Sequence, residues 1–191
     1  MICISKDWKD YELLETGDQQ KTERWKDIIL RRPDPQCIWP YPSGSKLLPH
    51  GIYNRSNSGG GSWTWNKPIP KRWKISYKEL KFFVEPTGFK HTGLFPEQAY
   101  NWDFLIDKIN NEYERRTDEI NVLNLFAYTG GATVACAYAK AAVCHVDASK
   151  GMVTRAKENA QLSGLADAKI RYIVDDVVKF VRREINRNSK Y

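Results

Sequence analysis

Residues 124–133 have the sequence NLFAYTGGAT. The β-rich apolar run 120–126 ends there in a turn with two adjacent glycines, Gly130 and Gly131, and an alanine-rich segment typical of a helix follows. Glycine lets the backbone adopt unusual dihedral angles and lets a ligand approach closely. The turn lacks the GxGxxG spacing of dinucleotide sites, and the sequence has no GxxxxGK[ST] phosphate loop. Taken alone, it fits a ligand site and a tight strand–helix connection equally well.

Strands and helices alternate on both sides of this turn. Such alternation predicts an α/β fold of parallel βαβ units, with helices on both faces of the sheet. The expected helices begin near residues 96, 132, 150 and 177, and the expected strands are 120–126, 142–146 and 170–174.

Acidic residues follow the next two expected strands. Asp147 ends one of them about 20 residues beyond the glycine turn, where a carboxylate can accept hydrogen bonds from ribose hydroxyls. Asp175 and Asp176 end the other, where a carboxylate can accept the exocyclic amine of adenine. Capping of the following helix is the alternative role for Asp147 and Asp176. Together the three strand ends predict a nucleoside pocket without a phosphate grip, which suits S-adenosylmethionine (SAM) better than NAD or ATP.

The same part of the chain resembles class I SAM-dependent methyltransferases, in the branch that includes the large-subunit rRNA cytosine-C5 methyltransferases. The N-terminal stretch from Asp10 to Pro40 also looks like SAM-dependent methyltransferases. The resemblance therefore covers nearly the whole chain. The sequences that carry it most clearly are FKHTGLFPEQ (89–98), VLNLFAYTGG (122–131), VDAS (146–149) and DDV (175–177).

The resemblance implies a SAM site and assigns roles position by position. The turn would wrap the methionine and ribose parts, the end of the second strand would hold the ribose and adenine, and the preceding loop would close over the cofactor. The residues so implied are Phe126, Ala127, Tyr128, Thr129 and Gly130 in the turn, Asp147, Ala148 and Ser149 after the second strand, Asp175 and Asp176 after the third, and Thr92, Phe95 and Gln98 in the loop.

The sequence also departs from the family. The family has a further strand ending in an Asp-Pro-Pro type motif at the methyl-acceptor site, and this motif is absent here. We therefore expect the SAM-binding half of a methyltransferase domain, truncated before the acceptor half and inactive alone. A half-sheet that ends at its third βα unit would leave an unpaired, apolar strand edge, which favours self-association. Cytosine-C5 transfer also needs a cysteine nucleophile, but Cys136 and Cys144 are expected in the core and the catalytic residues stay unidentified.

The N-terminal part has a different composition. Residues 1–90 hold 16 Lys and Arg against 10 Asp and Glu, and six of the seven Trp. Cations and aromatic faces together suit a polyanion such as RNA, while the alternative is a small β core with a solvated basic surface. We expect a β-rich domain at 1–85, including a hairpin at 73–85 and a flexible loop at 56–62, and the SAM-binding portion at 86–191.

Composition limits the classes of protein. The 191 residues carry a net charge of +7 and 28% charged residues, as in ordinary globular domains. No apolar run approaches the length of a membrane span, and the N-terminus lacks a signal-peptide pattern. Four widely spaced cysteines predict neither disulfides nor a metal site, so a cytoplasmic location is expected. The predicted function is SAM-dependent methylation, with RNA such as rRNA as substrate. The alternatives are an inactive RNA-binding module and, more weakly, an NAD-linked oxidoreductase.

Overall fold

The computed structural model describes residues 4–56 and 59–191, which form two compact units. The first, here called the β unit, contains Asp7–Lys78 and Phe83–Leu94. The second, here called the αβ unit, contains Glu79–Phe82, Phe95–Tyr191 and the N-terminal residues up to Lys6. The domain division at residues 85 and 86 stays a prediction. No helix in the described ranges is long and apolar enough to cross a membrane.

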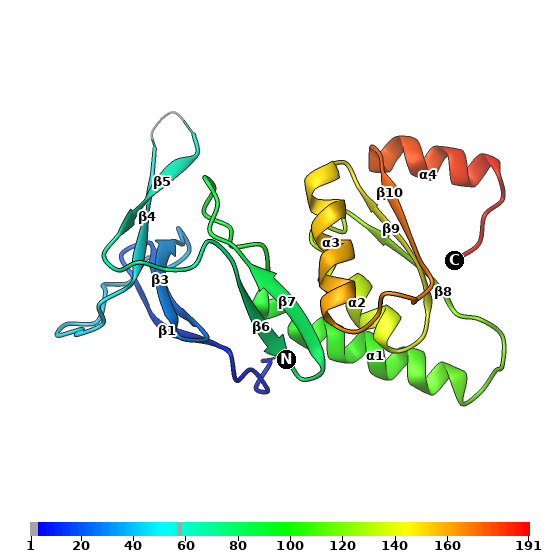
Figure 1. The fold of residues 1–191 in the computed structure, drawn as a ribbon, viewed down its shortest axis with the longest axis horizontal. Coiled ribbons are helices and arrows are strands. Elements are labelled where there is room, and N and C mark those ends of the chain that lie inside the picture. Colours follow the sequence, from blue (N-terminus) through cyan, green and yellow to red (C-terminus); the bar gives the residue numbers. More distant parts are fainter. Residues whose placement is uncertain (1–3, 57–58) are drawn as a thin grey trace. The chain divides into compact units, whose positions relative to one another are not determined.

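The β unit is built on a five-stranded sheet in the order β1-β2-β3-β4-β5 (Figure 1). All neighbouring strands are antiparallel except β3 and β4, which are parallel. A separate two-stranded sheet pairs β6 with β7, the hairpin expected at 73–85, although residues 80–82 of β7 are grouped with the αβ unit. The strands are β1 (Tyr11–Gly17), β2 (Gln20–Trp25), β3 (Ile28–Pro33), β4 (Gly51–Arg55), β5 (Gly61–Trp65), β6 (Trp73–Tyr77) and β7 (Leu80–Val84).

Lys26 has a positive φ of 61° and turns the chain between β2 and β3. The structure corrects one local expectation in this unit. The expected flexible loop 56–62 includes residues 57–58, which lie outside the described residues, but its end at Gly61 already belongs to β5. Strand β5 forms there because it pairs with β4 from Gly51↔Trp65 to Arg55↔Gly61, a tertiary contact that local composition does not reveal.

A buried ion pair lies at the centre of the β unit. Glu23 is fully buried and Arg32 is 5% exposed. The Arg32 Nε and Nη2 groups donate to the two Glu23 carboxylate oxygens at 2.7 and 2.9 Å. The Tyr11 hydroxyl also donates to Glu23, and Arg32 Nη1 donates to the Lys90 carbonyl at 2.7 Å. The pair therefore joins strands β1, β2 and β3 to the 86–94 loop.

The αβ unit contains a three-stranded parallel sheet in the order β10-β9-β8, which confirms the predicted strand–helix alternation. Helices begin and end close to the positions expected. The elements are η1 (Pro96–Gln98), α1 (Ala99–Tyr113), β8 (Asn121–Leu125), α2 (Gly131–Tyr138), β9 (Ala142–Asp147), α3 (Lys150–Leu162), β10 (Ile170–Val174) and α4 (Val177–Asn186).

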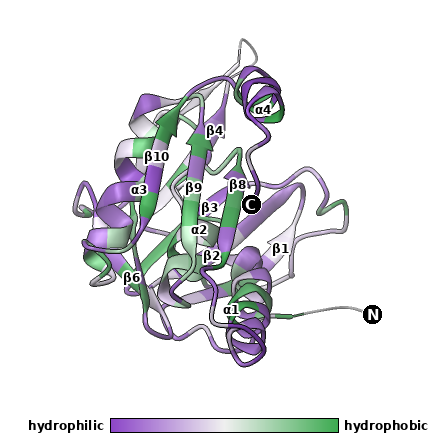
Figure 2. Cartoon of the chain, turned by 90° about the vertical axis from the view of Figure 1, so that its right-hand side faces the viewer, coloured by the Kyte–Doolittle hydropathy of each residue, from purple (hydrophilic) through white to green (hydrophobic). Residues whose placement is uncertain are grey.

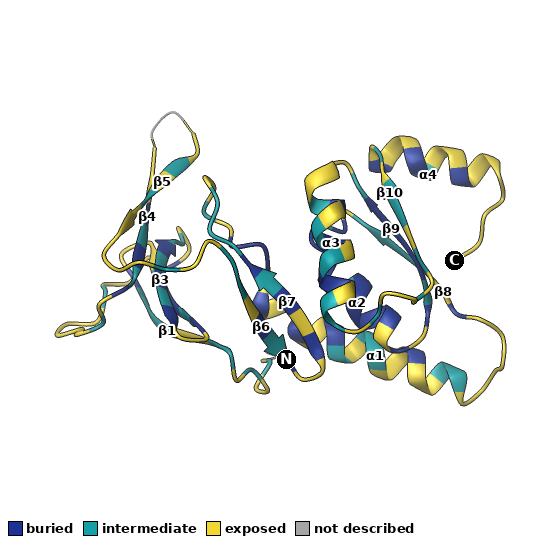
Figure 3. Ribbon diagram, in the orientation of Figure 1, coloured by how far each residue is buried: buried dark blue, intermediate teal, exposed yellow. Residues whose placement is uncertain are grey.

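Alternate residues of β9 pack on opposite faces of this sheet. Val143 packs with Ile109 of α1 and Cys136 of α2 on one face. Val146 packs with Phe180 of α4 on the other face. Figure 2 shows hydrophobic residues on the strands, and Figure 3 shows buried and exposed residues alternating along α4. The helices thus cover both faces, as the α/β pattern predicts.

His145 lies fully buried in β9 between these elements. Its Nδ1 lies 2.9 Å from the Thr133 hydroxyl, and that hydroxyl accepts the Asn124 amide at 2.8 Å. Which of the Thr133 hydroxyl and His145 Nδ1 donates depends on the tautomer of the ring. Nε2 has no hydrogen-bond partner among the described residues. Burial lowers the pKa of His145 from 6.5 to about 4, against a smaller opposing effect of Asp147.

Removing one partner of the buried ion pair should destabilise the protein more than removing one partner of an exposed ion pair. Arg32→Ala removes the bidentate partner of the buried Glu23 carboxylate and leaves it with Lys21 Nζ at 3.5 Å, so it should lower the free energy of unfolding by about 3 kcal/mol. Arg116→Ala, which removes an exposed partner of Glu112, should lower it by less than about 1 kcal/mol. Urea unfolding followed by tryptophan fluorescence measures both. Equal losses in the two variants would contradict this account.

Neutral, buried His145 predicts an acid-sensitive fold. As pH falls below 6.5 the unfolded histidine gains a proton that the folded one resists, so stability is lost from about pH 6.5 down to about pH 4. The full difference is about 3 kcal/mol. Urea midpoints between pH 7.5 and 4 should fall less steeply for His145→Gln than for the parent chain. Identical slopes would show that His145 does not titrate in this way.

Candidate cofactor site

The turn after β8 has an unusual backbone. Phe126 and Tyr128 both have φ of 51°, and Gly130 has φ of 83°. Positive φ in bulky residues is rare and requires surrounding structure to hold it. A Cβ on Gly130 would lie 2.8 Å from the Ala156 Cβ of α3, so only glycine fits there. This explains why the turn needs Gly130 and shows that it packs directly on α3.

Asp147 holds the turn from the neighbouring strand. Its Oδ2 accepts the Tyr128 N–H at 2.9 Å, and its Oδ1 accepts the Ser149 N–H at 2.9 Å. The Ala127 N–H also donates to the Val146 carbonyl at 3.1 Å. An ionised carboxylate has about four acceptor positions, so Asp147 retains capacity for two further donors. A ribose with two adjacent hydroxyls supplies that pair of donors.

The rest of the turn is fixed by helix α3. The buried Asn159 amide donates to the Thr129 carbonyl at 2.9 Å. Ser149 is the N-cap of α3, where its hydroxyl accepts the Met152 N–H at 3.4 Å. Ala148, between Asp147 and Ser149, is exposed. The predicted residues of the first two strand ends therefore lie together around one turn.

The end of β10 brings the other two carboxylates to the same edge of the sheet. The Asp175 N–H donates to the Asp147 carbonyl at 3.1 Å. The Asp175 carboxylate forms an ion pair with Arg183 of α4. Asp176 is the N-cap of α4, with Oδ1 accepting the Lys179 N–H at 2.9 Å. The capping role considered for Asp176 is thus present, whereas Ser149 rather than Asp147 caps α3.

The three residues predicted from the preceding loop have different surroundings. The Phe95 ring lies 5.3 Å from the Tyr128 ring, in contact with the turn. Gln98 accepts the Asn101 amide at 2.8 Å. Thr92 belongs to the β unit, where it is fully buried and its carbonyl accepts the Glu85 N–H. The Thr92 hydroxyl has no hydrogen-bond partner within the described residues.

Sequence reasoning missed one residue at this edge. Val174, the last residue of β10, is the register partner of Asp147 and is 50% exposed. Phe126, at the end of β8, is 75% exposed. Exposed apolar residues thus lie at the ends of the two strands that neighbour the end of β9. The available signal was the position of Val174 as the last apolar residue before Asp175.

Cys136 and Cys144 are not placed for nucleophilic chemistry. Cys136 and Cys144 are buried in the two core clusters, as expected. Burial raises the pKa of Cys136 to about 11 and also raises the pKa of Cys144. Both therefore remain thiols at neutral pH, and a thiol is a weak nucleophile. The arrangement can hold a nucleoside and orient what is attached to it.

Comparisons with known proteins agree with this geometry. A crystal structure of the SAM-dependent methyltransferase from Agrobacterium tumefaciens is 35% identical with a TM-score of 0.89, over 98% of this chain and 59% of that one. "Ribosomal RNA large subunit methyltransferase K/L" of Shewanella frigidimarina is 37% identical over 112 residues, 58% of this chain and 14% of that protein. Its namesake in Shewanella sp. (strain MR-4) is 30% identical over 170 residues, 86% of this chain and 23% of that protein.

This chain thus spans less than a quarter of the length of those curated relatives. The model of the S-adenosylmethionine-dependent methyltransferase family matches residues 25–186, which covers most of both units. The match confirms the resemblance seen in the sequence, and the chain belongs to the S-adenosylmethionine-dependent methyltransferase family.

Proposed function

We propose that this chain supplies the SAM-binding part of an RNA methyltransferase. The observation that carries the proposal is the Asp147 carboxylate, which holds the positive-φ turn with one hydrogen bond from Tyr128 and keeps acceptor capacity for a ribose. Bound SAM would supply an electrophilic methyl group on its sulfonium sulfur. The chain's own residues would bind and orient the cofactor, and positioning alone can provide a large share of catalysis.

The residues assigned to the site divide by the part of SAM that they would meet. Asp147 would accept the ribose hydroxyls, with Ala148 and Ser149 beside the adenine. Asp175 and Asp176 would meet the adenine edge, although each already has a structural partner. The remaining residues proposed for the methionine end and for closure over the cofactor are Phe126, Ala127, Tyr128, Thr129, Gly130, Thr92, Phe95 and Gln98.

RNA is the proposed methyl acceptor because of two observations. The curated relatives are named as ribosomal RNA methyltransferases. The basic excess of the chain also lies within residues 1–90. Most of this stretch belongs to the β-rich domain that we propose for residues 1–85, separate from the SAM-binding portion. Cations attract the phosphate backbone irrespective of sequence. An enzyme with this substrate would act in the cytoplasm.

The cofactor proposal predicts that one carboxylate controls binding. Asp147→Asn removes the charge and halves the acceptor capacity facing the ribose, so affinity for S-adenosylhomocysteine should fall at least about tenfold. Isothermal titration calorimetry of both chains measures the loss. Asp167→Asn is the matched control, because Asp167 is exposed before the start of β10, at the opposite end of that strand.

Three outcomes are informative. Binding of S-adenosylhomocysteine but not NAD, lost in Asp147→Asn and kept in Asp167→Asn, supports the proposal. Equal binding in both variants contradicts the role of Asp147. Binding of NAD instead would favour the oxidoreductase alternative.

The open edge of β8 leads to a second proposal, that the isolated chain associates with itself. In the described sheet β8 pairs on one side only, with β9. In a parallel pair alternate residues direct their N–H and C=O groups outward, and an unpaired edge of this kind invites a further strand. The Ala142 N–H donates to Ile120, which places Asn121 and Leu123 among the outward-facing residues.

Self-association should therefore depend on concentration and on this edge. Light scattering after size-exclusion chromatography should show a mass above that of one chain, and Asn121→Pro, which removes an outward N–H at an exposed position, should reduce it. A single monomeric species across a dilution series would refute association.

A further inference from the structure

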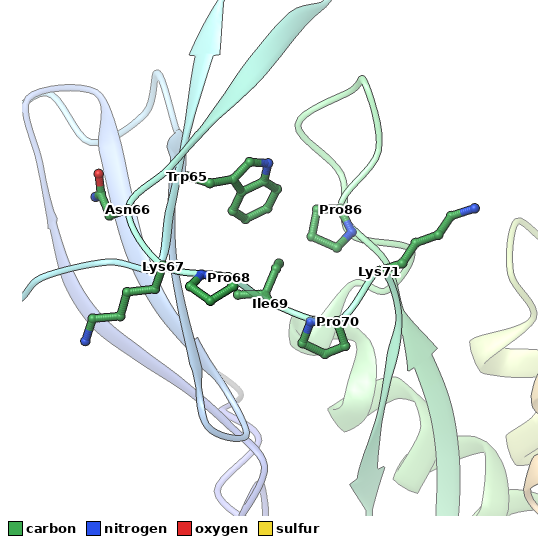
Figure 4. Close-up of a pocket in the computed structure, with 8 residues that line it drawn as sticks. All are labelled: Trp65, Asn66, Lys67, Pro68, Ile69, Pro70, Lys71 and Pro86. Atoms are coloured by element: carbon green, nitrogen blue, oxygen red, sulfur yellow. The ribbon is translucent and has the colours of Figure 1, made fainter.

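A cavity lies entirely within the β unit, with a volume of about 490 Å³. This volume is in the range of about 300–1,000 Å³ that accommodates small ligands. Its centre is apolar, and the Trp65 indole, Ile69 and Pro86 face it in Figure 4. The full lining is Trp65, Asn66, Lys67, Pro68, Ile69, Pro70, Lys71 and Pro86.

Trp65 is exposed and yet held in place. Its side chain is 44% exposed. A Cβ on Gly51, its partner across β4 and β5, would lie 2.3 Å from the indole, so the ring occupies space that only glycine leaves open. On the same strand Trp63 stacks on it at 5.0 Å between ring centroids, and the Trp63 Nε1–H donates to Thr87 at 2.8 Å. The result is a preorganised aromatic surface.

The chain beyond Trp65 is also rigid. The backbone N–H groups of Asn66 and Lys67 both donate to the His50 carbonyl, at 2.8 and 3.3 Å. The Asn66 amide donates to Pro49 at 3.0 Å. Pro68 and Pro70 follow, each with a fixed φ. A rigid wall loses little conformational entropy when a ligand binds.

The cavity lies in the most one-sided charge segment of the protein. Residues 35–78 contain seven Lys and Arg and no Asp or Glu. Two of these cations, Lys67 and Lys71, belong to the cavity wall, and in Figure 4 their side chains extend away from it on opposite sides. An apolar centre with a cation on either side suits a ligand that has a flat apolar group between two anionic groups of the same polymer.

We propose that this cavity binds an unpaired base of single-stranded RNA, with the base stacked on Trp65 and the flanking phosphates near Lys67 and Lys71. Stacking on aromatic rings together with a basic surface is how single strands are bound without sequence preference. The inference rests on the proposed RNA substrate and deepens it, because it identifies the residues of the β unit that would hold the RNA.

The test measures binding of fluorescein-labelled ten-nucleotide oligouridylate and oligoadenylate by anisotropy, using the full chain. Trp65→Ala should weaken binding about five- to hundredfold, and Trp65→Phe should restore most of it. Trp39→Ala is the matched control, because Trp39 is 48% exposed in the same unit but bonds to Thr16 and is not in the cavity wall. Lys67→Gln with Lys71→Gln should lower the salt slope of binding by about 0.7 per lysine.

The outcomes separate this inference from the proposed function. Oligonucleotide binding that is unchanged in Trp65→Ala, or equally weakened in Trp39→Ala, overturns the cavity assignment and leaves the RNA substrate standing. Displacement by polyglutamate as effective as by unlabelled oligonucleotide also overturns it, because charge alone would then explain binding. Failure of the parent chain to bind any oligonucleotide removes the RNA proposal itself, while S-adenosylhomocysteine calorimetry still reports on the cofactor site. Far-UV circular dichroism of each variant verifies that it is folded.

Discussion

The hydrogen bond from the Tyr128 N–H to the Asp147 carboxylate joins the end of β8 to the end of β9. It supplies an acceptor for the N–H of a residue whose φ of 51° is unfavourable. The same carboxylate accepts the Ser149 N–H and so also sets the start of α3. One side chain therefore fixes the turn and the start of the next helix, and the proposed contact with a ribose would use the same carboxylate.

The β unit depends on a buried ion pair, Glu23 and Arg32, whose charges are neutralised inside the protein. Glu23 and Arg32 are both buried, and their stability requires that every donor and acceptor be used. Tyr11 and Lys21 provide further contacts to Glu23, and the Lys90 carbonyl accepts a further hydrogen bond from Arg32. In the αβ unit a charge faces outward with acceptor capacity to spare, whereas in the β unit the charges are satisfied internally. Only the first arrangement invites a ligand.

Local pattern was sufficient for the αβ unit and insufficient for the β unit. The expected strands and helices after residue 96 match the structure because periodicity and alternation determine parallel βαβ units. Strands β4 and β5 were missed, since their stability comes from pairing between residues such as Gly51 and Trp65. Within the site, the sequence could not decide the role of Asp176. A helix N-cap and a residue that binds adenine would both be an aspartate at this position. Val174 was missed because its position before Asp175 does not reveal that it is 50% exposed at the end of the folded sheet.

The contact between Gly130 and Ala156, together with the hydrogen bond from Asn159 to Thr129, has a dynamic consequence. A shift of the turn would displace the middle of α3, because Gly130 lies directly against Ala156 and the Asn159 amide is hydrogen-bonded to the Thr129 carbonyl. Local opening of α3 and reorganisation of the turn are thus one cooperative event. Occupancy of the turn by a ligand should accordingly be communicated to amide groups one to two helical turns away, so that α3 serves as an internal reporter of whether the site is filled.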